Sequence, residues 1–236
     1  MKVNPVAGSA ALLAGVLLVA GCGGSGGSGG GAGHPAQLTL GKEFPAVKAA
    51  ALAATSVRMS GSVVQDGKAL SLDMAFVKPS SAAGSVSQAG TSYTIVVTPA
   101  QDYIQISKEF LKAGSLPASL CARACGKYLE ISSSSAAAFS GLSMGSMVSS
   151  VFSKPLSKDE AGIKLTAGQY RGQPAWTGSG GGETFYISKG STPYLLSVSK
   201  NGQTVSFTGW DSTTIAPPPA GEMLTTAQLG QLAAGG

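Results

Sequence analysis

The stretch VRMSGSVVQDGKALSLDMAF, residues 57–76, reads as two strands joined by a tight turn, and the rest of the fold is built around this hairpin. Apolar and polar residues alternate from Val57 to Val63, which is the period of a half-buried strand. Asp66-Gly67 then gives one of the strongest signals for a two-residue hairpin turn. The alternation predicts a hairpin with one buried face. On the return strand, that face would carry Leu70, Leu72, Met74 and Phe76.

The same period continues on both sides of this hairpin. A second hairpin is predicted around Asn201-Gly202, and Pro217-Pro218-Pro219 is expected to prevent further pairing in the centre of the sheet. Helical spacing of apolar residues predicts helices over 43–54 and 135–152, and 164–168 fits either a short helix or a strand. The strand-like segments total about eight to ten antiparallel strands. Outside the first hairpin they include 85–87, 93–98, 103–107, 128–131, 185–187, 194–198 and 205–209.

A broad sheet with one apolar face and few helices to cover it tends to curl. The predicted fold class is therefore α+β, with a large curved antiparallel sheet forming a half-barrel and two or three helices packed in its concave face. Large aromatic side chains are few, so we expect an apolar cavity to remain in that face. Its predicted lining is Leu70, Leu72, Met74, Phe76, Tyr93, Ile95 and Val97.

The N-terminus has the layout of a secretory signal, with Lys2 followed by an apolar run up to Gly21. The run is shorter than the roughly 20 residues that span a bilayer. Its end, Leu18-Val19-Ala20-Gly21-Cys22, resembles the lipobox of bacterial lipoproteins, which implies cleavage after Gly21 and a diacylglyceryl group on Cys22. Residues 1–21 would then be the signal peptide, 22–42 a Gly/Ser-rich tether and 43–236 a single half-barrel domain. The protein would be anchored to membrane lipid through Cys22, on the extracytoplasmic face of the cell membrane.

Composition argues against several classes of function. Charged residues make up 11% of the chain and are scattered, with a net charge of +5, so no basic stripe for nucleic acid is present. The single histidine, His34, lies in the predicted tether, so no Ser-His-Asp or Cys-His arrangement can form within the domain. We therefore expect a protein that is not an enzyme and holds no metal or other cofactor.

Two cysteines remain once Cys22 is assigned to lipidation. Cys121 and Cys125 form an even pair in a compartment that is oxidising, which favours a disulfide. Residues four apart in a regular helix are about 6 Å apart at Cα, so the bond would need a turn or a distorted helix end, which Gly126 permits. Free buried thiols are the alternative. A redox motif would have two intervening residues, and a metal site would need further ligands.

The order of these features resembles the LppX/LprG-type lipoproteins of high-GC Gram-positive bacteria, which share the LolA-like fold. The resemblance rests on the lipobox and tether, the strand at 57–63, the Lys-Tyr-Leu-Glu strand at 127–130 and the ending from Pro193 to Pro218. It implies a half-barrel whose cavity accepts lipid acyl chains. The expected function is a non-catalytic binder or carrier of lipid or another amphiphile. The alternative is a structural or protein-interaction lipoprotein of the cell envelope without a ligand.

Overall fold

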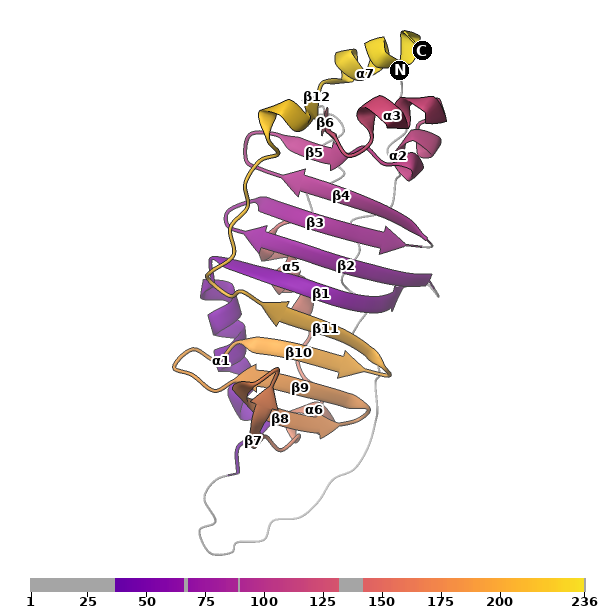
Figure 1. Cartoon of the computed structure of the whole chain (residues 1–236). Coiled ribbons are helices and arrows are strands. Elements are labelled where there is room, and N and C mark those ends of the chain that lie inside the picture. The colour runs from indigo at the N-terminus through magenta and orange to yellow at the C-terminus, as the bar shows by residue number, and fades with distance from the viewer. Residues whose placement is uncertain (1–36, 66–67, 89, 132–141, 236) are drawn as a thin grey trace, which may run out of the picture.

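A single open sheet of 12 strands organises the protein, in a computed structural model that describes residues 37–65, 68–88, 90–131 and 142–235 (Figure 1). The strand order is β12-β6-β5-β4-β3-β2-β1-β11-β10-β9-β8-β7. All neighbouring strands are antiparallel except β12 and β6, which are parallel, so the sheet is mixed and the expectation of a purely antiparallel sheet is corrected. The fold class α+β with one large sheet is confirmed at this level.

The described elements have the following bounds. The strands are β1 (Ser56–Gln65), β2 (Lys68–Val77), β3 (Ser81–Gln88), β4 (Thr91–Val97), β5 (Asp102–Gln105), β6 (Tyr128–Ile131), β7 (Thr166–Tyr170), β8 (Gln173–Gly180), β9 (Glu183–Ser188), β10 (Leu195–Lys200), β11 (Gln203–Thr208) and β12 (Met223–Leu224). The helices are α1 (Leu40–Ala53), α2 (Lys108–Ala113), α3 (Cys121–Ala124), α5 (Met144–Val151), α6 (Lys158–Ala161) and α7 (Thr226–Ala234), with short 3-10 turns at Ala118–Leu120 and Ala220–Glu222.

The hairpin predicted from residues 57–76 lies at the centre of the sheet. Val57 is opposite Phe76, and the ladder runs without a break to the pair Gln65 and Lys68. This register leaves two residues for the connection, as the predicted turn at Asp66-Gly67 requires, although those two residues lie outside the described ones. The hairpin at Asn201-Gly202 is confirmed, with both residues at positive φ as a primed turn demands.

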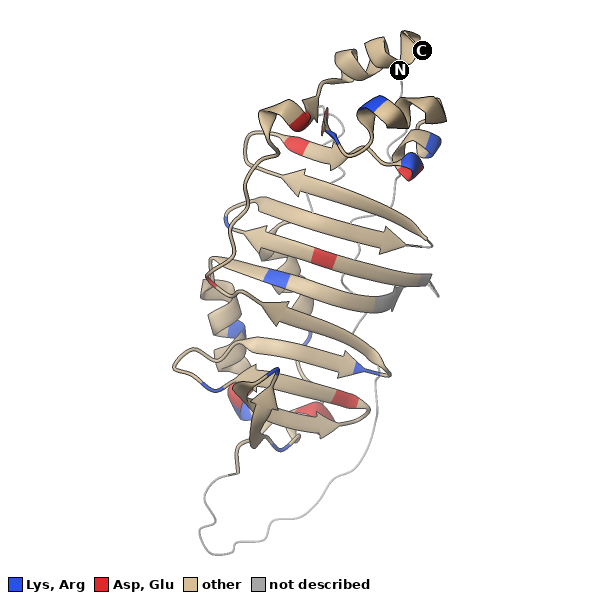
Figure 2. Cartoon of the chain, viewed as in Figure 1, with Lys and Arg blue, Asp and Glu red and all other residues tan. Residues whose placement is uncertain are grey.

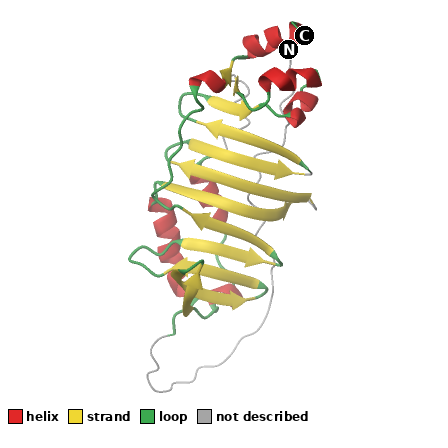
Figure 3. Ribbon diagram, in the orientation of Figure 1, coloured by secondary structure: helices red, strands yellow, loops and turns green. Residues whose placement is uncertain are grey.

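Helices are divided between one face of the sheet and one of its ends. In Figure 1, α1, α5 and α6 lie behind the sheet, whereas α2, α3 and α7 gather at the end formed by β5, β6 and β12; Figure 3 shows the same division by colour. Helix α1 begins at Leu40, after the extended residue Thr39, so the predicted domain start at Glu43 lies inside this helix. Thr39 also forms a β-bridge with Lys164, which ties the segment before α1 to the segment before β7.

The opposite face of the central sheet is polar. Figure 2 marks one basic position on β1 and one acidic position on β2, in the middle of the sheet. These are Arg58 and Asp73, which form an ion pair across the hairpin at 2.7 Å. Both side chains are about half exposed, so the pair contributes little to stability. The helix-facing side therefore holds the apolar core.

The C-terminal segment adds one edge strand that was not predicted. After β11 the chain runs along the sheet and adds β12 beside β6 at one edge, so the pairing that follows the prolines at 217–219 is not in the centre of the sheet (Figure 1). They lie in the connecting segment, outside the sheet, where no ladder donor is needed. Strand β8 and helix α7 were not predicted either. Segment 164–168, predicted as helix or strand, contributes its last residues to strand β7.

Candidate ligand cavity

A cavity of about 70 Å³ lies between the sheet and the helices that cover it. Its floor comes from β1, β2 and β9–β11, one wall comes from α1, and the other comes from the end of α5 and the residues after that end. The lining is Leu40, Phe44, Val47, Met59, Leu72, Ser150, Val151, Phe152, Ser153, Lys154, Leu156, Phe185, Ile187, Leu195, Val198, Val205 and Phe207.

Strand alternation explains most of the floor. Phe185 and Ile187 of β9 are two apart, as are Val205 and Phe207 of β11, so each pair points to the same face. Strand β10 breaks this rule because its register shifts between Leu195 and Ser197. A bulge of this kind adds a residue to one strand and reverses the alternation beyond it.

The β10 bulge corrects one sequence prediction. Leu195 and Val198, three residues apart, both line the cavity. Strict alternation along the predicted strand 194–198 would put Leu196 and Val198 on one face and Leu195 on the other. Periodicity alone gave no signal for the extra residue, because a bulge depends on the pairing with β9 and not on the strand's own sequence.

The helical walls are joined to each other by two contacts. The rings of Phe44 in α1 and Phe152 at the end of α5 lie 5.5 Å apart at their centroids, in a tilted arrangement. The Lys48 ammonium donates a hydrogen bond of 3.2 Å to the carbonyl oxygen of Phe152. Both contacts converge on the residue at which α5 ends, so this point fixes the width of the cavity.

Polar lining groups come from one short segment only. Ser150, Ser153 and Lys154 lie close together around the end of α5, and the other lining residues are apolar. The Ser153 hydroxyl donates to the Ser150 carbonyl oxygen at 3.0 Å. The Ser150 hydroxyl oxygen is buried and has no hydrogen-bond partner within the described part of the chain. A buried, unpaired hydroxyl costs free energy, so its position in a cavity calls for an explanation.

The predicted lining is only partly reproduced. Of its seven residues, Leu72 lines this cavity. Five of the others are packed in the core, and Tyr93 is half-buried against it. The prediction chose the correct face of the sheet but placed the cavity near β2–β4, whereas it lies toward β9–β11. The five core residues are Leu70, Met74, Phe76, Ile95 and Val97.

Other titratable groups of note lie away from the lining. Glu183 at the start of β9 is 3% exposed and forms an ion pair with Lys200 of β10. Burial raises the pKa of Glu183, and the Lys200 ammonium opposes that rise. Asp211 accepts hydrogen bonds from the amide and hydroxyl of Thr55, at 2.6 and 2.9 Å, and from the Tyr194 hydroxyl. These contacts hold the segment after β11 against the start of β1.

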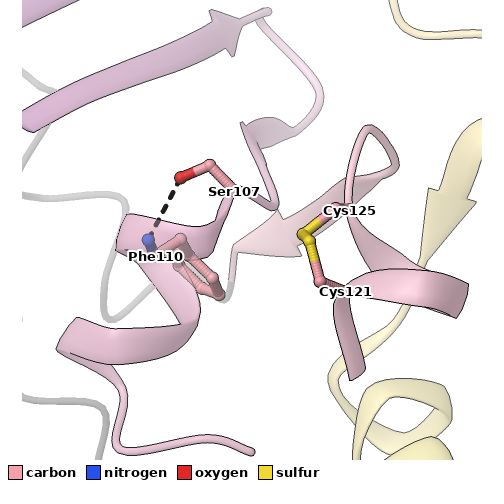
Figure 4. The surroundings of a disulfide bond; sticks show 4 residues. All are labelled: Ser107, Phe110, Cys121 and Cys125. Atoms are coloured by element: carbon pink, nitrogen blue, oxygen red, sulfur yellow. Dashed lines mark hydrogen bonds between the residues drawn. A yellow bond between two sulfur atoms is a disulfide. The ribbon is translucent and has the colours of Figure 1, made fainter. Parts of the chain in front are cut away.

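The two cysteines of the domain form a disulfide in the structure (Figure 4). Their Cα atoms are 4.5 Å apart. Helix α3 ends between them because Cys125 has an extended backbone, and Gly126 follows at positive φ. Figure 4 also shows the Ser107 hydroxyl accepting from the amide of Phe110, which caps the neighbouring helix α2. The bond thus pins a short helical connection between β5 and β6.

The predicted lipidation site Cys22 and cleavage site Gly21 lie outside the described residues. Within residues 37–235, leaving aside the three undescribed gaps, no helix has the length and hydropathy needed to cross a membrane. In the same residues, no group of three or more His, Cys, Asp and Glu side chains is arranged to hold a metal ion.

Comparison with known proteins gives little further guidance. No protein-family model matches the chain, and no curated protein matches it. Among solved structures, the chain is similar to an uncharacterized conserved protein from Thermus thermophilus, with a TM-score of 0.30 and 10% sequence identity. That likeness covers 78% of this chain and 97% of the other. A likeness this weak carries no argument about fold or function, so the functional proposal is based on the cavity itself.

Proposed function

We propose that this protein is a membrane-anchored, extracytoplasmic lipoprotein that binds or carries a lipid or another amphiphile and catalyses no reaction. The anchor is Cys22, and the binding site is the cavity between the sheet and helices α1 and α5. The proposal includes the half-barrel architecture of the LppX/LprG-type lipoproteins with the LolA-like fold. Its ligand would be a lipid tail, because a cavity with apolar walls selects for apolar groups.

The observation that carries this proposal is the apolar lining. Side chains from five strands and helix α1 converge on one space without filling it, and they contribute no charged or hydroxyl group. Protein interiors are normally close-packed, and each unfilled volume costs free energy. A cavity that remains at the junction of sheet and helices is therefore consistent with a binding site kept in spite of its cost in stability.

The small volume of the cavity favours a second candidate function, that of a structural or protein-interaction lipoprotein. At about 70 Å³ it holds only about five to seven water-sized spheres, well below what a drug-sized ligand occupies. A structural or protein-interaction lipoprotein with a collapsed cavity would show such a remnant. Carriage of a longer tail therefore requires α5 and the residues after it to move away from α1. The contacts at Phe152 are the ones that would have to break.

The first test is native mass spectrometry of the full chain carrying Cys22→Ala, purified without detergent, together with organic extraction of the same sample. Co-purifying lipid is the result expected of a carrier. Repeated absence of lipid, with no uptake of added amphiphile, would favour a structural or protein-interaction lipoprotein without a ligand.

A pair of variants on one strand separates a cavity from ordinary core. Leu72→Asp should keep its fold and lose saturable binding of the neutral dye Nile red, because its carboxylate can be hydrated from the cavity. Met74→Asp is the matched control. It lies two residues away on the same face, is 2% exposed and does not line the cavity, so its buried carboxylate should unfold the protein. If both variants unfold and the parent chain binds no dye, the carrier proposal fails.

A further inference from the structure

We infer that the ligand of this cavity is a single unbranched alkyl chain that lies across the strands of the sheet, from β2 to β9. This inference rests on the proposed function and names the shape of the ligand and its orientation in the same site. The tail alone is at issue, whatever headgroup it carries.

The strand register places lining side chains in a row that crosses five neighbouring strands, β2, β1, β11, β10 and β9. Each member of the row is the direct cross-strand partner of the next. Side chains at directly paired positions lie on the same face, about 5 Å apart. The row is Leu72, Gly61, Val205, Val198 and Phe185, and all of these except Gly61 line the cavity.

A second set of lining residues follows the same direction. Met59 of β1 is opposite Phe207 of β11, and Leu195 of β10 is opposite Ile187 of β9. On β1, β11 and β9 these residues are two positions from the first row, which is about 7 Å along a strand. The floor therefore has two rows that border one groove, and the groove runs across the strands.

Gly61 gives the first row a position without a side chain. Met59, two residues earlier on β1, lines the cavity, so position 61 belongs to the same face. The backbone of Gly61 has a φ of +156°, and a Cβ built there would lie 2.2 Å from the carbonyl oxygen of Thr204. A larger residue is therefore excluded, and the row keeps a gap over β1.

The roof of the cavity follows the same direction as the floor. Helix α1 crosses the strands on the covered face instead of running along them (Figure 1). Its lining residues Leu40, Phe44 and Val47 are four and three positions apart, so they form one stripe along the helix, about 10 Å long. The space between this stripe and the rows beneath it is therefore elongated across the strands.

Side chains close both ends of the first row. Beyond its β9 end, the next paired position is Gly178 of β8, and a Cβ built there would lie 2.7 Å from side-chain atoms of Ile163 and Leu165. Beyond its β2 end, the next paired position is Val86 of β3, which packs against the core and does not line the cavity. The groove therefore has a fixed length.

This geometry limits both the length and the width of a ligand. Five strands spaced about 4.8 Å apart span up to about 19 Å. An extended alkyl chain advances about 1.3 Å per carbon, from bonds of about 1.5 Å, so the groove holds at most about 15 carbons. The volume of about 70 Å³ amounts to about five to seven water-sized spheres, little more than one for each strand crossed. Two chains side by side do not fit this space.

The test uses the full chain carrying Cys22→Ala, stripped of lipid, with Nile red bound in the cavity. Octyl, decyl, dodecyl, tetradecyl and hexadecyl dimethylamine oxide, which are uncharged overall at neutral pH, compete with the dye below their micelle concentrations. Each added methylene should lower the displacing concentration about fourfold while the groove fills. The gain should stop by the hexadecyl compound, which is longer than the groove.

A branched competitor tests the width of the groove. The 2-butyloctyl dimethylamine oxide is an isomer of the dodecyl compound, so the two carry the same number of carbons. The branched isomer should need a concentration at least about 10-fold higher, because leaving two methylenes unburied already exceeds that factor.

Variants assign the length limit to the ends of the row. Phe185→Ala and Leu72→Ala, one at each end, should let the gain continue to longer chains, and either variant suffices if the other unfolds. Val198→Ala, in the middle of the row, should improve binding of the branched isomer without lengthening the series. Ile95→Ala is the matched control for Leu72→Ala, since it removes the same number of atoms from a core residue of β4 that is 3% exposed and does not line the cavity. It should change neither the length limit nor the preference for the straight chain.

The outcomes separate this inference from the proposed function. A gain that continues through the hexadecyl compound in the parent chain, or equal displacement by the two dodecyl isomers, would overturn the inference and leave a lipid-binding protein standing. Absence of saturable dye binding would overturn the proposed function and the inference with it.

Discussion

Replacing Ser150 by alanine should stabilise the ligand-free protein. The Ser150 hydroxyl is buried at the cavity, and no partner for it exists in the described residues. Removing a buried, unpaired polar group recovers about 1–3 kcal/mol of desolvation free energy. Alanine also has a better helix propensity than serine, by at most about 0.7 kcal/mol, and this position lies near the end of α5.

The larger cavity left by the substitution lowers stability, but by less than the desolvation gain. Loss of the oxygen enlarges the cavity by about 10 Å³, which costs roughly 0.2 kcal/mol at about 24 cal/mol per Å³. The desolvation gain therefore decides the sign, and the free energy of unfolding should rise by about 1–3 kcal/mol.

The assay is urea unfolding of the full chain carrying Cys22→Ala, after lipid extraction, with the midpoint and slope measured separately. A shift in midpoint at constant slope reports stability alone. Ser149→Ala is the matched control, since Ser149 is exposed on the same helix and gains helix propensity without losing a buried hydroxyl. If the two variants gain equally, the Ser150 hydroxyl carries no desolvation cost, and the reasoning is refuted.

Three further predictions concern the anchor, the disulfide and one perturbed tyrosine. Cys22→Ala should move the protein from the membrane to the soluble fraction, because diacylation anchors stably; pelleting after a salt wash would contradict the lipobox interpretation. Cys121 and Cys125 should resist thiol labelling in denaturant until reductant is added, and labelling beforehand would exclude the bond. The hydrogen bond to Asp211 raises the pKa of Tyr194 from 10.0 to about 12, so the stability contributed by the neutral phenol is present below pH 10 and is lost as the pH rises through about 12. Asp211→Asn should lower that pKa in a titration of phenolate absorbance, and an unchanged curve would show that the bond is absent.

The central hairpin and the face that it buries follow from local sequence alone. Alternation from Val57 to Phe76 fixes which side chains point to the core, and the two-residue turn fixes the register, since a slip of one residue would expose the whole apolar set. The turn at Asn201-Gly202 was readable for the same local reason. The disulfide expected from the even pair Cys121 and Cys125 is present, and the alternative of free thiols is not.

The position of the cavity depends on how distant segments pack together, and local sequence does not predict it. Alternation names the buried face of each strand, but it does not say which part of that face a helix covers or how completely side chains fill the space beneath. Leu72 and Met74 have the same pattern, yet one lines the cavity and the other is packed in the core. The β10 bulge, the parallel pairing of β12 and the convergence of α1 and α5 on Phe152 join segments far apart in the chain. Such features follow from long-range packing, which leaves no local period in the sequence.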